Sequence, residues 1–473
     1  MAARLSMQAS LWIVTLWVAR LLVPADYGTM AAGMVFLGFA DLLAEAGFGR
    51  ALIQKSTLER NDIACAFTVS LLLSAVFYMA CWGLAPFAGL YLDQPDFTVF
   101  LRSLALLVLL VPFRTVSLAL LDRDLRLGGQ AAIHVVVALI QSGTVLGLAL
   151  AGFGYWALAA GAFAARILEV GLLGLLAGWT PALAWPTRHQ MGLLWFGLHA
   201  SLGTLLWYFY SKSDVALVGK LGPDVLGWYS LAFQLISMPV EKLTSNANQV
   251  AYPVFCRLQD RPDQLRDWYV RLTVLLGFFG LPALAGMGLV APDAFGLLLG
   301  PRWLPAIVPF QILSFVGMVL LYSTTLVPFL NALGRPDVNL RWTATCAAIM
   351  PLTFLIGRHI GGLLGICLAW LVCFPLLVSG FFHWTSSLTG ITLGRLLRAQ
   401  LPVFAGVLTM SLAVVGFRWL FFASETEADA LRLVGSIAIG VISYAGFMLA
   451  FARQSVLQDL KRLLREFRGG SQG

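Results

Sequence analysis

The chain has 473 residues, of which 59% are hydrophobic and only 11% charged, and its mean hydropathy is +0.85. A soluble domain carries about a quarter charged residues, so this composition argues against a soluble enzyme and indicates a protein with many membrane spans. The six cysteines contain no Cys-x-x-Cys pair, which argues against both a zinc site and a disulfide framework.

Apolar stretches long enough to cross a bilayer recur along the whole chain. The first follows Arg4 and has no small-x-small cleavage site before Pro24, so we read it as a retained helix rather than a signal peptide. The sequence predicts an all-α integral membrane protein with about fourteen transmembrane helices, at residues 5–23, 27–48, 64–91, 99–121, 130–152, 154–178, 191–219, 223–255, 270–291, 304–332, 341–357, 362–386, 399–422 and 431–452.

Two turns between such helices share their residue types. Residues 20–28 and 220–229 each contain a cation, a leucine, a proline, an aspartate and a glycine in that order. This repetition predicts two six-helix lobes related by a parallel internal repeat, followed by two further helices. We therefore expect an N-lobe at 1–182, a C-lobe at 183–390 and helices thirteen and fourteen at 391–452. A basic amphipathic tail at 453–473 follows, and it suits either contact with anionic lipid of the inner leaflet or a plain cluster of charges that sets the topology.

Positive charges mark the orientation. With the N-terminus inside, the cytoplasmic loops and tail hold twenty Lys and Arg residues and the outer loops hold five. Because Lys and Arg concentrate on the cytoplasmic side, the sequence predicts an even number of spans with both termini in the cytoplasm.

Ionisable residues inside the spans are functional candidates, because each is costly to insert into a bilayer. Asp41 and Glu45 share one helix face at a spacing of four. Lys212 and Asp214, two residues apart, point in different directions, so at least one of them needs a partner on another helix or faces water. Arg20 suits either a snorkelling anchor or a cavity lining. The other candidates are Arg114, Arg166, Glu169, Glu241, Lys242 and Arg418, and for Arg166 and Glu169, three residues apart, we favour an intrahelical ion pair.

These residues predict a water-filled cavity lined by cations and some acids. Cations suit an anionic substrate such as a phosphate or pyrophosphate head group, and the acids suit coupling to H+ or Na+; the sequence leaves the coupling ion open. The usual hydrolase, metalloprotease and nucleotide motifs are missing, and Asp122-Arg123-Asp124 is too short a match to predict a glycosyltransferase. We expect no catalytic residue, no metal site, no other cofactor and no nucleic-acid partner.

Several stretches in order make the chain resemble the bacterial oligosaccharide flippases of the polysaccharide biosynthesis family, in the multidrug/oligosaccharidyl-lipid/polysaccharide exporter superfamily. Each stretch alone is weakly specific, but the ordered set covers nearly the whole chain. They are residues 19–28, 45–54, 214–220, 252–259, 299–303 and 332–337.

The resemblance implies a fourteen-helix flippase of the bacterial inner membrane. Such proteins move undecaprenyl-diphosphate-linked repeat units by alternating access, for exopolysaccharide, capsule or O-antigen synthesis, and use arginines in the cavity against the diphosphate. That role carries over best to Arg20. We add Lys212 and Arg114 because they are cations inside the predicted spans. Asp41, Glu45 and Asp214 are the coupling candidates. The implied partners are the lipid-linked oligosaccharide, membrane lipids, and a polysaccharide polymerase with its export machinery.

Two other functions stay open. A multidrug-type cation antiporter of the same superfamily would favour twelve helices and an acidic cavity, whereas this sequence predicts fourteen helices and several cations. A membrane glycosyltransferase or polymerase would favour a large external loop, whereas the predicted outer loops are short.

Overall fold

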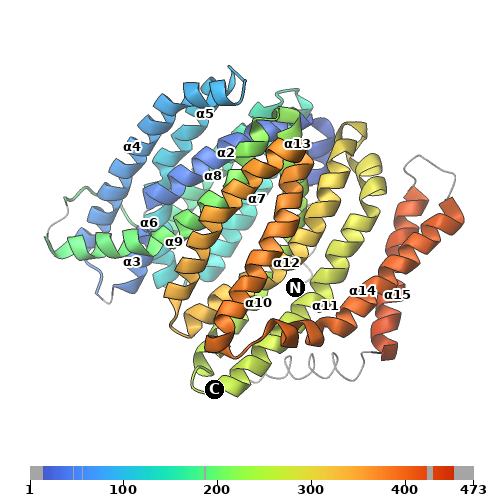
Figure 1. Cartoon of the computed structure of the whole chain (residues 1–473). Coiled ribbons are helices and arrows are strands. Elements are labelled where there is room, and N and C mark those ends of the chain that lie inside the picture. Colours follow the sequence, from blue (N-terminus) through green and yellow to red (C-terminus); the bar gives the residue numbers. More distant parts are fainter. Residues whose placement is uncertain (1–13, 46, 56, 186–187, 423–429, 452–473) are drawn as a thin grey trace. The chain divides into compact units, whose positions relative to one another are not determined.

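The structure, a computed structural model, describes residues 14–45, 47–55, 57–185, 188–422 and 430–451, although not the side chains of 188–201 and 422. This part of the chain is helical with short turns and contains no strand (Figure 1). The chain consists of two compact units, unit 1 (Met1–Ser230) and unit 2 (Leu231–Gly473). The lobes and further helices expected from the repeat remain a prediction, and the expected tail at 453–473 lies outside the described residues.

Unit 1 begins with the helical residues 14–21 and holds α2 to α9 and the start of α10. Pro24 begins α2 and Pro223 begins α10, in keeping with the preference of proline for the first turn of a helix, where its missing N–H breaks no bond. The helices are α2 (Pro24–Glu45), α3 (Phe48–Gln54), α4 (Arg60–Tyr91), α5 (Phe97–Ala105), α6 (Val111–Arg123), α7 (Leu127–Leu150), α8 (Tyr155–Ala177), α9 (Arg188–Gly219) and α10 (Pro223–Arg257).

The stretch expected as one span at 99–121 is divided in the structure. A 3-10 turn, Leu106–Leu110, separates α5 from α6. Pro112 lies two residues after this turn and has no N–H to bond the carbonyl one helical turn earlier, which accounts for the local change of helix type. The three pieces together remain long and apolar enough to cross a membrane.

Unit 2 holds the rest of α10 and α11 to α15. Figure 1 shows α14 and α15 as an orange-red hairpin, and both of its helices pack against α11. The helices are α11 (Pro262–Ala294), α12 (Ile307–Ala332), α13 (Pro336–Thr389), α14 (Leu393–Phe422) and α15 (Ala430–Phe451), with a π-helical turn at Phe295–Leu299 and a 3-10 turn at Pro301–Ala306 between α11 and α12.

Helix α13 contains a break where the sequence predicts the end of one span and the start of the next. Gly362 there has φ 57° and ψ −129°, and Gly154 before α8 has φ 55° and ψ −137°. Only glycine adopts this backbone conformation readily. The same rare geometry therefore opens the helices that we expected as the sixth and the twelfth, which supports the internal repeat.

Ten helical segments of the described chain are long and apolar enough to span a membrane. Their residues overlap the expected ranges, and α13 covers two of those ranges. Much of the first expected range lies outside the described residues, so the number of fourteen spans stays a prediction.

Contacts in unit 1 bring alternate connections of the chain to the same end. At one end Thr29 bonds Gln94, and Asp26 accepts a hydrogen bond from the Tyr155 amide. At the other end Arg123 donates to the carbonyls of Leu52 and Lys55. In a chain that crosses a membrane repeatedly, alternate connections between helices lie on the same side. The grouping of these contacts agrees with the predicted alternation of cytoplasmic and outer loops.

Candidate functional site

Five ionisable residues from four helices of unit 1 form what we call the charged cluster. It consists of Asp41 on α2, Arg114 on α6, His134 on α7, and Arg166 and Glu169 on α8. Arg166 Nη2 lies 2.6 Å from Asp41 Oδ2, and Arg114 Nε lies 3.0 Å from Glu169 Oε2. His134 Nδ1 lies 3.7 Å from the other carboxylate oxygen of Glu169.

Packing of α7 on α8 places His134 beside Glu169. Gly161 on α8 makes this close approach possible, because a Cβ at that position would overlap the Val145 side chain of α7. The three-residue spacing of Arg166 and Glu169 puts both side chains toward neighbouring helices on one side of α8. The cluster is therefore held by the backbone packing of the unit and not by a loop.

The expected intrahelical pair between Arg166 and Glu169 is wrong. Each residue pairs instead with an opposite charge on another helix, Asp41 for Arg166 and Arg114 for Glu169. Hydrogen bonds between oppositely charged side chains are stronger than hydrogen bonds between neutral groups. Pairing between helices also neutralises charges that are costly within a membrane. Sequence spacing could nominate both α8 residues but could not reveal their partners.

The cations proposed for substrate binding have different surroundings. Arg20 lies on an exposed face that it shares with Trp17 and Leu21, and Lys212 on α9 is partly buried. Neither makes an ion pair with the residues that the structure describes. Arg114 is 35% exposed and already bonds Glu169, so any anion there competes with a carboxylate.

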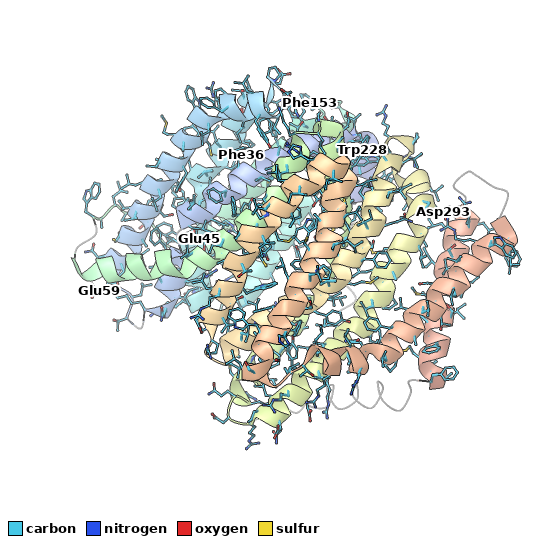
Figure 2. The ribbon with its side chains drawn as sticks, viewed as in Figure 1. Phe36, Glu45, Glu59, Phe153, Trp228 and Asp293 are labelled. Atoms are coloured by element: carbon cyan, nitrogen blue, oxygen red, sulfur yellow. The ribbon has the colours of Figure 1, made fainter. Side chains whose placement is uncertain are left out.

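The three proposed coupling acids also differ. Asp41 belongs to the charged cluster. Glu45, labelled in Figure 2, lines a small cavity together with Leu42, Gly47, Arg50 and Thr204. Arg50 Nη2 lies 3.5 Å from Thr204 Oγ1 across this cavity.

Asp214 on α9 is buried, and its carboxylate accepts hydrogen bonds from Tyr229 Oη at 2.5 Å and from the Val215 amide at 2.6 Å. Tyr229 lies on α10, so the expectation that Lys212 or Asp214 needs a partner on another helix is confirmed. Sequence reasoning did not identify Tyr229, since a tyrosine in an apolar helix is usually part of the core.

The two repeated turns, residues 24–28 and 223–227, pack directly against each other in unit 1; we call them the paired turns. The Ala25 amide donates to Asp224 Oδ1 at 3.1 Å, and the Val23 amide donates to Asp26 Oδ2 at 3.1 Å. The turn residues singled out from the sequence are thus neighbours in space, and their aspartates hold helix-start amides.

A second contact lies beside the paired turns. Lys220 Nζ lies 2.8 Å from Asp93 Oδ2, and Tyr91 Oη donates to the Ala216 carbonyl at 3.3 Å. Lys220 also approaches the ring of Tyr91, with 5.5 Å from Nζ to the ring centroid. The turn between α4 and α5 is therefore tied to the end of α9 at this end of the unit.

Unit 2 has its own buried ionic group, the α11 triad of Asp293, Arg418 and Arg432. Asp293, labelled in Figure 2, has a fully buried side chain near the end of α11. Its carboxylate binds Arg418 of α14 at 2.9 Å and Arg432 of α15, whose Nε lies 2.6 Å away. The triad joins the last two helices to the body of the unit. Within the described residues no group of three or more His, Cys, Asp or Glu side chains could hold a metal ion.

The sequence is similar to known proteins of polysaccharide biosynthesis. The sequence model of a family described as polysaccharide biosynthesis protein matches residues 17–308. The lipopolysaccharide biosynthesis protein WzxC of Escherichia coli (strain K12) is 24% identical over 368 residues, which are 75% of this chain and 73% of that protein. The succinoglycan biosynthesis transport protein ExoT of Rhizobium meliloti (strain 1021) is 23% identical over 450 residues, 94% of this chain and 90% of its own length.

Solved structures show the same fold. The lipid II flippase MurJ in an inward closed conformation superimposes with a TM-score of 0.76 at 11% identity, covering 96% of this chain and 99% of that one. An inward-facing multidrug resistance MATE family transporter of the MOP superfamily gives 0.64 at 15% identity, covering 80% and 93%. The prediction of an all-α, multi-pass membrane fold is confirmed.

Proposed function

Because the chain belongs to the polysaccharide biosynthesis protein family, we propose that it is a flippase for undecaprenyl-diphosphate-linked oligosaccharide repeat units. It moves them across the bacterial inner membrane by alternating access and does no covalent chemistry. The observation that carries the proposal is the match along 94% of the chain with a relative that is named a transport protein of succinoglycan biosynthesis. The likeness to a lipid II flippase over 96% of the chain supports the same conclusion through the fold.

We expect the cations of the proposed site to bind the diphosphate group of the substrate. Arg20, Lys212 and Arg114 all belong to unit 1, so this site needs no residue of unit 2. Guanidinium groups offer planar pairs of N–H donors that match phosphate oxygens, and Lys212 adds a point charge. Arg20 and Lys212 make no ion pair with the described residues, so their charge is available to a ligand, which favours them as the first contacts.

Coupling to H+ or Na+ belongs to the acids Asp41, Glu45 and Asp214. We place both termini in the cytoplasm, as the excess of Lys and Arg in alternate connections requires. Membrane lipids surround the spans, and a polysaccharide polymerase with its export machinery receives the translocated unit.

The multidrug-type antiporter remains the second candidate, favoured by the structural likeness to a MATE transporter. That function calls for a cavity that attracts cations. Arg20 and Lys212, which make no ion pair with the described residues, suit an anionic ligand better, which is why we place the flippase first.

Reconstitution tests the proposal directly. Proteoliposomes that contain the purified chain should move a fluorescent lipid-linked oligosaccharide between leaflets, and protein-free vesicles should not. Arg20→Ala should weaken diphosphate binding by about 10- to 150-fold, which corresponds to one charge-assisted contact of about 1.5–3 kcal/mol. Arg20→Lys should restore binding only in part. A chain that moves no lipid-linked sugar but transports cationic drugs would overturn the proposal, and normal transport by a stably inserted Arg20→Ala chain would reduce Arg20 to a snorkelling anchor.

A further inference from the structure

Glu169 is shared by two basic side chains. Arg114 Nε lies 3.0 Å from Glu169 Oε2, and His134 Nδ1 lies 3.7 Å from Glu169 Oε1. The carboxylate is only 13% exposed, whereas Arg114 is 35% and His134 50% exposed. The largely buried Glu169 carboxylate is thus hydrogen-bonded to Arg114 and lies within ion-pair distance of His134.

His134 lies on the polar face of α7. Seven residues on, Gln141 occupies the same face and is also exposed. The opposite face carries large exposed apolar side chains, at Val136, Leu139, Ile140 and Leu150. An apolar exposed face is what lipid requires, so the face with His134 is the one suited to water, and protons can reach its imidazole.

The other charged groups near His134 already have partners. Helices α8 and α6 pack against α7, and they contribute Glu169, Arg166, Arg114 and Asp122. Asp122 accepts a hydrogen bond at 2.8 Å from Gln130, one turn before His134 on α7. Arg166 is bound by Asp41 of α2 at 2.6 Å. Glu169 is therefore the carboxylate positioned to exchange between Arg114 and a protonated His134.

We propose that Glu169 acts as an internal substitute for an anionic ligand at Arg114. When a diphosphate binds Arg114, the Glu169 carboxylate pairs instead with His134, which has become a protonated imidazolium. The exchange needs one proton, which His134 takes up from water. Apart from the N–H bond that this proton forms, and the O–H bond of its donor that breaks, no covalent bond changes. This inference rests on the proposed function, since it adds a regulating carboxylate and histidine to the same diphosphate site.

The exchange fixes the direction of pH dependence. Imidazole side chains change charge between about pH 5 and 8, and the proposed exchange requires the charged form of His134. A ligand that binds together with a proton binds more tightly as pH falls, by at most about tenfold per pH unit for one proton. Diphosphate affinity should therefore rise when pH is lowered from 8 to 6.

Binding to the purified full chain tests this exchange. A suitable probe is a short-chain polyprenyl diphospho-N-acetylglucosamine, a diphosphate diester whose own charge is constant over this pH range. The native chain should bind it severalfold more tightly at pH 6 than at pH 8. His134→Gln should remove that difference, and Glu169→Gln should give tight binding at both pH values because Arg114 no longer has a competing partner. His383→Gln, the same change on an exposed histidine of α13, should behave as the native chain does.

A second measurement needs no ligand. In a histidine NMR titration, the resonance that disappears in His134→Gln should titrate at lower pH in the Glu169→Gln chain, because the imidazolium has lost its carboxylate. An unchanged midpoint overturns the exchange, as does weaker binding in Glu169→Gln. If the native chain binds no diphosphate at either pH while the NMR midpoint shifts, the pairing of His134 with Glu169 stands and the diphosphate assignment of the proposed function fails.

Discussion

Gly28 and Gly227 lie against each other's helix starts in unit 1. A Cβ on Gly28 would overlap the carbonyl of Pro223, and a Cβ on Gly227 would overlap the carbonyl of Pro24. The relationship is reciprocal because both turns have a proline four residues before the glycine. Main chains can approach this closely only where neither residue has a side chain.

Alanine at Gly28 should separate the paired turns. The added methyl group meets backbone, which cannot rotate away as a side chain can, so α2 and the start of α10 must move apart. Cysteines placed at Asp93 and Lys220 in an otherwise cysteine-free chain and joined by a bifunctional thiol reagent report this movement, because Lys220 Nζ and Asp93 Oδ2 of the native chain are 2.8 Å apart. We expect the cross-linking yield to fall severalfold and transport to fall with it.

Gly83→Ala is the matched control. Gly83 also lies in a helix, α4, but a Cβ there meets no atom within 4 Å. This chain should cross-link and transport as the native one does. Equal yields from Gly28→Ala and Gly83→Ala would contradict the prediction, because they would show that a methyl group at Gly28 does not separate the paired turns.

The α11 triad should contribute strongly to the stability of unit 2. Asp293→Asn leaves two guanidinium groups without their carboxylate in a buried place, and breaking a buried ion pair typically costs about 3–5 kcal/mol. Unfolding of the purified chain in mixed micelles, followed by tryptophan fluorescence, measures this loss of free energy.

A pair on two of the triad's three helices provides the comparison. Asp267 of α11 and Arg395 of α14 lie 2.7 Å apart with about half of each side chain exposed. Exposed pairs contribute at most about 1 kcal/mol, so Asp267→Asn should be nearly neutral. Similar losses for both variants would mean that burial does not distinguish the two pairs.

The proposed coupling acids should not be equivalent. Asp41→Asn removes the charge that neutralises Arg166, whereas Glu45→Gln changes a side chain for which the structure describes no ion pair. We expect Asp41→Asn to reduce export in cells more than Glu45→Gln at matched expression, and Asp214→Asn to act through its bond with Tyr229. Full export by all three variants would remove these acids from coupling.

Orientation in the membrane can be checked with reporter fusions. A fusion after Gly222 should report the outer side and one after Gly390 the cytoplasm, because the connections between them alternate. The fusion expected outside after Ser424 falls at a position beyond the described residues. A cytoplasmic signal after Gly222, or an outer signal after Gly390, contradicts the predicted topology.

The course of the chain could largely be predicted from its sequence because spans and turns are local features. Hydropathy located the helices, and glycine and proline located their ends, including the break at Gly362 inside α13. The repeated turns were also visible, although their contact with each other was not. A stretch such as 97–123 was less predictable, because the 3-10 turn before Pro112 interrupts the helix without any change in hydropathy.

Pairing of charges was the part that the sequence could not provide. Arg166 and Glu169 have an ideal spacing for an intrahelical pair, yet α2 and α6 offer both residues partners that are far away in the chain. Which helices become neighbours depends on packing, for example of Gly161 against Val145, and not on the charged residues themselves. For the same reason, His134 acquired a functional interpretation only from its distance to Glu169.

The α11 triad also constrains how the protein is made. The ribosome synthesises Asp293 well before its partners, and Arg432 follows it by 139 residues. Until α14 and α15 have been inserted, the carboxylate at the end of α11 lacks both of the cations that neutralise it in the finished unit. Nascent chains that stop before Arg418 should therefore be poor at completing membrane integration and become targets for quality-control proteases, even though all of the proposed substrate contacts have already been synthesised.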